Sequence, residues 1–151
     1  MTALEICGNR IIIGFDSGEI KIYNSVDLQC ESTLPYGVKN CVVRCFQSTC
    51  TEIIAGYDNG LVCVWNIQSG LLMTILPEGT VLDSSEAVSC MRWRKPHLVV
   101  GKENGKIGIW QWSNTSFMLL GQWDSNVGRV KRVEFDLEHV IVLEFGSVDA
   151  A

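Results

Sequence analysis

Three cysteines within a stretch of ten residues are the first candidates for chemistry in this sequence. Cys41 and Cys45 have three residues between them, and Cys45 and Cys50 have four. Zinc sites favour short paired spacings, with a second pair further along the chain. Because these spacings differ from that pattern, we interpret the thiols as packing residues and expect no metal site.

Two histidines could serve as a general base beside a cysteine nucleophile. His97 and His139 lie 42 residues apart. Such catalysis needs a third group that orients the base, and a cleft that holds the substrate. No motif marks that group, so we expect the protein not to be an enzyme. A hydrolase that uses His97, His139 or a cysteine remains the alternative.

Basic side chains offer a third chemistry, the binding of anionic groups. Arg44 and Lys131 each follow a valine, and Arg129, Lys131 and Arg132 form a small basic cluster. Guanidinium and ammonium groups bind carboxylates and phosphates. Arg44 and Lys131 are therefore candidates for contact with an acidic or phosphorylated partner, or else they are solvated charges.

The chain as a whole is acidic. Its 151 residues include 12 Lys and Arg against 17 Asp and Glu, for a net charge of -5. It therefore lacks the positive field that attracts nucleic acid or anionic membranes. No apolar run approaches the roughly 20 residues of a spanning helix, and Glu5 and Arg10 interrupt any signal peptide. With seven irregularly spaced cysteines, this predicts a single domain of the cytoplasm or the nucleus.

The elements that must position these residues form a repeat. Residues 14–23, 56–65 and 101–110 share the pattern G-x-[DE]-[SN]-G-x-[IV]-x-[IV]-[YW]. Its fixed positions are the first glycine (Gly14, Gly56 and Gly101), the second glycine (Gly18, Gly60 and Gly105) and the closing aromatic (Tyr23, Trp65 and Trp110). We expect the second glycine to supply positive φ in a tight hairpin turn, stabilised by the acidic and Ser/Asn side chains. The aromatics are expected to pack between sheets.

Strand patterns surround each turn. Three apolar residues precede it, at 11–13, 53–55 and 98–100, and alternating apolar residues follow it, as in half-buried strands. A further pattern begins at Val43, Val88 and Val130, and at Met1 in the first unit, and a strand candidate follows each aromatic. This predicts an all-β fold of four-stranded antiparallel units at 1–36, 37–79, 80–124 and 125–151, with about two strands in the last.

These units resemble the WD-repeat family of β-propellers in their period, their four strands and their turn glycine. Asn24 and Asn66 stand where that family often has the aspartate of a Trp-Asp pair. The resemblance implies a partial β-propeller of three complete blades plus part of a fourth, acting as a non-catalytic protein-binding module without a cofactor. Three and a half blades do not close a ring, so missing blades or another chain would be needed.

The hairpins that begin at Val88 and Val130 are also similar to the propellers of F-box/WD-repeat proteins, which are substrate receptors of ubiquitin ligases. That resemblance implies that the residue after the first valine of each unit faces the mouth of the central channel and binds phosphorylated motifs. The residues concerned are Arg44, Ser89 and Lys131, with Thr2 in the first unit and Arg129 close by. We expect protein partners with acidic or phosphorylated motifs, or, as the alternative, a scaffold role in a multiprotein assembly.

Overall fold

The protein consists of antiparallel β-sheets in the part of the chain that the computed structural model describes. That part comprises residues 1–34, 40–76, 86–113, 116–124, 130–135 and 140–144. Its strands form three four-stranded sheets and one two-stranded sheet, each made of consecutive strands. A search of the described residues finds no helix long and apolar enough to cross a membrane.

Each sheet is one blade, numbered in chain order. Blade 1 contains β1 (Ala3–Cys7), β2 (Arg10–Gly14), β3 (Ile20–Asn24) and β4 (Cys30–Thr33). Blade 2 contains β5 (Val43–Ser48), β6 (Glu52–Tyr57), β7 (Val62–Asn66) and β8 (Leu72–Leu76). Blade 3 contains β9 (Val88–Arg94), β10 (His97–Lys102), β11 (Lys106–Ser113) and β12 (Ser116–Asp124). Blade 4 is described for β13 (Val130–Phe135) and β14 (Val140–Glu144).

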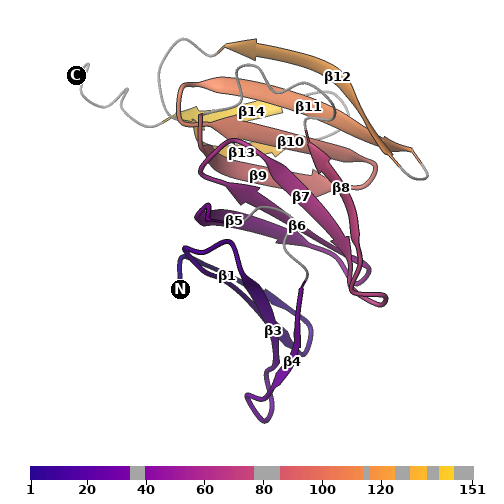
Figure 1. Ribbon diagram of the computed structural model, residues 1–151. Helices are drawn as coiled ribbons and strands as arrows, with labels where there is room; N and C mark the ends of the chain where they lie inside the picture. The colour runs from indigo at the N-terminus through magenta and orange to yellow at the C-terminus, as the bar shows by residue number, and fades with distance from the viewer. Residues whose placement is uncertain (35–39, 77–85, 114–115, 125–129, 136–139, 145–151) are drawn as a thin grey trace.

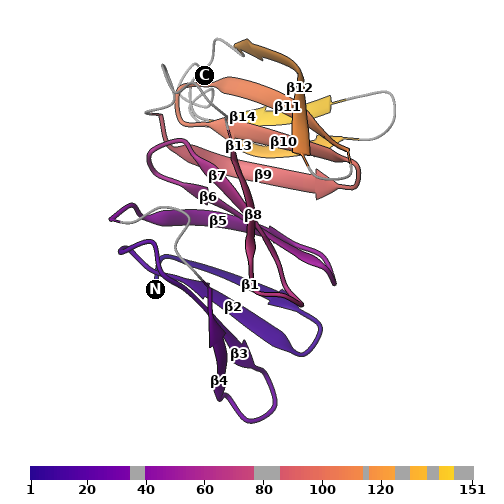
Figure 2. The same cartoon turned by 45° about the vertical axis from the view of Figure 1, so that its right-hand side comes forward.

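The blades stack face to face in chain order (Figure 1). The first strand of each blade contacts the first strand of the next, from β1 through β5 and β9 to β13. Figure 2 shows the same succession after a turn of 45°. Because each complete sheet runs in order from its first to its fourth strand, the fourth strands form the opposite edges. This is the arrangement of a partial β-propeller, and it confirms the fold class predicted from the sequence.

The turn between the second and third strands follows the chemistry of the repeated motif. Gly18, Gly60 and Gly105 have φ values of 91°, 87° and 89°, in the region that favours glycine. The residue before each glycine accepts a hydrogen bond from a backbone amide two residues further on, at 3.1 Å for Asn59 and 3.1 Å for Asn104. The same acceptor in blade 1 is the hydroxyl of Ser17. Each hairpin is therefore closed by local contacts.

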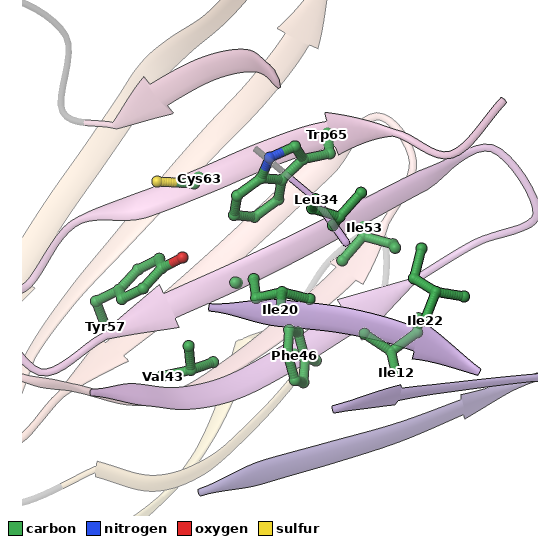
Figure 3. Packing of buried hydrophobic residues seen from close by; sticks show 11 residues of the cluster. Ile12, Ile20, Ile22, Leu34, Val43, Phe46, Ile53, Tyr57, Cys63 and Trp65 are labelled. Carbon is green, nitrogen blue, oxygen red and sulfur yellow. The ribbon is translucent and has the colours of Figure 1, made fainter. Parts of the chain in front are cut away.

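Apolar side chains fill the spaces between consecutive blades. Between blades 1 and 2, Ile12 and Ile22 meet Val43, Phe46 and Trp65 (Figure 3). A second cluster joins blades 2 and 3, and a third joins blades 3 and 4. Neighbouring residues of a strand point to opposite faces, so Val64 faces blade 3 while Trp65 faces blade 1. Blade 2 thereby contributes buried side chains to two clusters, one on each of its faces.

The first glycine of the motif lies at the closest approach between blades. A Cβ atom on Gly14 would lie 2.6 Å from Cγ1 of Val43, a distance that real Cβ atoms essentially never show. Gly56 stands in the same relation to Val88, also at 2.6 Å. The third contact, from Gly101 to Val130, has the same 2.6 Å distance. These glycines are required by packing between blades rather than by a turn.

The closing aromatics occupy equivalent places on three blades. Trp65 is fully buried between blades 1 and 2. Trp110 is half-buried and packs against the cluster between blades 2 and 3. Tyr23 is half-buried on the face of blade 1 that points away from blade 2, since its neighbour Ile22 belongs to the cluster with blade 2. Each aromatic therefore faces the position of the preceding blade.

Candidate partner-binding rim

Three of the residues singled out as partner contacts occupy the same irregularity in their strands. In blade 2, Val43 pairs with Tyr57 and Cys45 with Gly56, which leaves Arg44 as an extra residue. In blade 3, Val88 and Cys90 pair with consecutive residues of β10, so Ser89 is extra. Lys131 is skipped in the same way between β13 and β14. Each is a β-bulge, which bends the strand and re-aims a side chain.

We call Arg44, Ser89 and Lys131 the bulge row, with Thr2 at the corresponding place in blade 1. The backbone N–H of Thr2 donates a hydrogen bond of 2.8 Å to the carbonyl of Gly14, and its hydroxyl donates to the same oxygen at 3.2 Å. Consecutive first strands contact one another. The row therefore runs from blade to blade along the N-terminal ends of these strands. The bulges therefore place residues distant in sequence along one rim.

Arg44 is the best-defined anion-binding group on this rim. Its side chain is exposed, and within the described part of the chain its guanidinium forms no ion pair. A guanidinium presents five N–H donors in a planar fork that fits carboxylates and phosphates. A rigid strand position with an exposed guanidinium is suited to capture an anionic group from a partner.

The residue just before β5, Val42, is held by the turn of the same blade. The backbone N–H of Val42 donates to Oδ1 of Asp58 at 3.1 Å, and the N–H of Asp58 donates to the carbonyl of Val42 at 3.0 Å. The turn of blade 1 also holds this strand, because the N–H of Val43 donates to the carbonyl of Phe15 at 3.3 Å. The bulge of Arg44 is therefore anchored from two blades.

Ser89 has a different environment from Arg44. Its side chain is half-buried, and its hydroxyl donates a hydrogen bond to the backbone carbonyl of Val130 in blade 4. The structure thus gives Ser89 a contact between blades 3 and 4. The side chain of Lys131 and the whole of Arg129 lie outside the described residues, as does His139.

The charges around the rim are mixed. Asp16 is exposed in the turn of blade 1, and Lys102, Glu103 and Lys106 lie at the equivalent turn of blade 3. Burial lowers the pKa of Lys102, and the nearby charge of Lys106 lowers it further, against the opposite effect of Glu86. Charges of both signs therefore lie at blade 3, whereas Arg44 is the single lysine or arginine in the described part of blade 2.

Two of the cysteines, Cys63 and Cys45, pack in the apolar clusters between blades. Burial raises the pKa of the Cys45 and Cys63 thiols to about 12, so almost none of either is present as the nucleophilic thiolate at neutral pH. Cys41 is half-buried, and Cys50 is exposed in the turn after β5. Within the described ranges, no three His, Cys, Asp or Glu side chains gather closely enough to hold a metal ion.

Polar contacts between blades were not apparent from the sequence. Ser48 donates to Oε2 of Glu5 at 3.2 Å, and the backbone N–H of Trp93 donates to Oε1 of Gln47 at 3.0 Å. Lys95 forms an ion pair with buried Glu52 at 3.5 Å. The partners in each contact lie more than forty residues apart. These contacts link blade 1 to blade 2 and blade 2 to blade 3.

Comparison with known proteins adds to the description of the fold. No protein-family model and no curated protein matches the sequence. Among solved structures, the chain is similar to the computationally designed Ika8 protein, with a TM-score of 0.79 and 25% identity over 93% of this chain and 42% of that one. It is similarly close to the computationally designed Ika4 protein, with a TM-score of 0.77 and 25% identity over 93% and 82% of the two chains.

A natural protein also shares the arrangement. Raptor from Chaetomium thermophilum matches with a TM-score of 0.73 and 17% identity, over 95% of this chain. The match spans only 15% of Raptor, so this chain corresponds to a small part of that protein, and to less than half of Ika8. The likeness agrees with a propeller-like all-β fold.

Proposed function

We propose that this chain is a non-catalytic protein-interaction module that binds an acidic or phosphorylated peptide motif at the bulge row. The observation that carries the proposal is the repeated bulge, which occurs at the same step of β5, β9 and β13. It places Arg44 on an exposed rim without an ion-pair partner among the described residues. Rigid scaffolds that present loop and rim residues are typical of binding proteins.

The proposed partner is another protein. One structure similar to this chain is titled Mitotic Checkpoint Complex, with a TM-score of 0.72 and 15% identity over 88% of this chain and 39% of that one. This fold therefore occurs in a chain that assembles with other proteins. Within the proposal, the resemblance to F-box/WD-repeat propellers favours a substrate receptor of a ubiquitin ligase, working in the cytoplasm or the nucleus on phosphorylated motifs.

Peptide binding tests the proposal. An oriented library of phosphoserine and phosphothreonine peptides is screened for binding, and the best sequence is measured by fluorescence anisotropy with and without its phosphate. Arg44→Ala should weaken binding at least about tenfold, because a hydrogen bond to a charged group contributes about 1.5–3 kcal/mol. Arg10→Ala is the matched control, since Arg10 is also exposed but pairs with Glu31 on the surface of blade 1.

The outcomes separate the proposal from its rivals. Loss of affinity on dephosphorylation and on Arg44→Ala, with Arg10→Ala unchanged, supports it. Binding that depends on Arg44 but not on phosphate favours a scaffold that recognises acidic sequences. Binding that depends on neither, or a library with no binder, overturns the proposed site.

A further inference from the structure

A second cationic side chain belongs to the contact between blades 2 and 3. Lys102 directly follows the first glycine of the motif, at the place that Tyr57 occupies in blade 2. Tyr57 is fully buried between blades 1 and 2, and its hydroxyl donates a hydrogen bond of 3.5 Å to the carbonyl of Gly18, in the turn of the blade before it. The equivalent place in blade 3 directs Lys102 toward the turn of blade 2.

Strand pairing assigns Lys102 to the same side of its sheet. Val43 pairs with Tyr57, and both belong to the cluster between blades 1 and 2. Val88 pairs with Lys102, and Val88 belongs to the cluster between blades 2 and 3. Because the side chains of directly paired residues lie on one face of a sheet, Lys102 faces blade 2.

The packing of Val88 connects this position with Arg44. Cγ1 of Val88 lies 2.6 Å from the point where a Cβ atom on Gly56 would lie, and the sulfur of Cys45 lies 3.1 Å from the same point. Cys45 directly follows Arg44 in β5, and β5 contacts β9. Arg44 and Lys102 therefore flank the contact between blades 2 and 3, at the end of the strands that carries the bulges.

The ammonium group of Lys102 has no anionic partner in the described part of the chain. Its side chain is half-buried and takes part in none of the ion pairs between described residues. Burial and the charge of Lys106 both lower the pKa of Lys102, and the opposing effect of Glu86 is smaller. A charge removed from water without a partner is costly, so an anion bound beside Lys102 would be stabilising.

We propose that Lys102 binds the phosphate of the partner motif together with Arg44, so that the site prefers a phosphorylated side chain to a glutamate or an aspartate. A phosphorylated side chain carries a charge of about −1.5 to −2 and three acceptor oxygens, which suits two cations from neighbouring blades. A carboxylate carries a single negative charge and gains less from the second cation. This inference rests on the proposed function and names phosphate as its anion.

Fluorescence anisotropy with two peptides tests the role of Lys102. One is the phosphopeptide selected from the library, and the other has glutamate in place of its phosphorylated residue. Lys102→Met should weaken binding of the phosphopeptide about tenfold and binding of the glutamate peptide less, while Lys102→Arg should retain the preference. Lys106→Met is the matched control, because it removes the same charge from an exposed residue of the same hairpin and should leave the ratio of the two affinities unchanged.

Inorganic phosphate provides a probe that does not depend on the library. In a sample with ¹³C-labelled lysine, phosphate should shift the Cε signal of Lys102 but not that of Lys106, and Arg44→Ala should reduce the shift. Circular dichroism verifies that each variant folds, and Lys102→Gln provides a second neutral variant.

The outcomes distinguish this inference from the proposed function. A Lys102 signal that phosphate does not shift overturns the inference, as does equal weakening of phosphopeptide binding by Lys102→Met and Lys106→Met. If Arg44→Ala weakens phosphopeptide binding while Lys102→Met and Lys102→Gln do not, the inference fails and the proposed function stands. If neither Arg44→Ala nor the Lys102 variants weaken binding, both fail.

Discussion

Replacing Gly56 by alanine inserts a methyl group into the contact between blades 2 and 3. The new Cβ atom would lie 2.6 Å from Cγ1 and 2.9 Å from Cβ of Val88, and 3.1 Å from the sulfur of Cys45. Val88 is fully buried in the cluster between these blades, so it has no open space to move into. The blades must separate or the side chains must leave their rotamers, which costs about 1–3 kcal/mol.

Gly121→Ala provides the matched control. Gly121 also lies in a strand, but a Cβ atom there would have no heavy atom within 4 Å. Both substitutions reduce the entropy of the unfolded chain in the same way, so that effect cancels in the comparison. Gly56→Ala should therefore be less stable than Gly121→Ala by about 1–3 kcal/mol.

A double-mutant cycle with Val88→Ala locates the cause. Val88→Ala removes Cγ1, the atom of Val88 nearest to the new methyl group. Gly56→Ala should therefore destabilise the Val88→Ala protein less than it destabilises the wild type, with a coupling energy of about 1 kcal/mol. The free energy of unfolding is measured in urea at one fixed protein concentration, because self-association would change the apparent stability. An additive cycle, or equal stability of Gly56→Ala and Gly121→Ala, would refute the packing role of this glycine.

Two further predictions concern blade 1. Leu28 is exposed and has a φ of 59°, at the place where blade 2 has Gly70 with a φ of 69°. Leu28→Gly should therefore raise the free energy of unfolding, measured in urea, by about 1 kcal/mol. Val26→Gly in the same turn should not raise it, and a destabilised Leu28→Gly protein would contradict backbone strain at Leu28. Burial raises the pKa of Glu5 above its ordinary 4.5, against opposing effects of Ser48 and a nearby arginine, so stability is lost as pH rises through the folded pKa. Glu5→Gln should match the wild type well below pH 4.5 and be the more stable protein at neutral pH, and a gain that is independent of pH would contradict this.

The turns could be predicted from the sequence because their chemistry is local. Asn59 and Asn104 bond to amides two residues away, beside a glycine with positive φ. The repetition of that pattern, together with alternating apolar residues, was enough to predict four-stranded sheets. It also placed the closing aromatics on equivalent positions.

The contacts between blades could not be predicted in the same way. The role of Gly56 depends on Val88, which lies in the next blade, so the motif alone could not assign it. Its sequence signal was its presence in the three units that carry the motif, at a position where no turn requires glycine. The bulge at Ser89 depends on strand pairing, and its hydroxyl bonds to a carbonyl 41 residues further along the chain.

Nuclear Overhauser effects between the motif glycines and valine methyl groups test the blade arrangement most directly. In a methyl-labelled sample, the Hα protons of Gly14, Gly56 and Gly101 should each show a contact with the methyl groups of Val43, Val88 and Val130, respectively, since the Cγ1 atoms lie against these glycines. Three equivalent contacts are the predicted result. Their absence, or contact of these glycines with valines of their own blades instead, would contradict a stack of successive propeller blades.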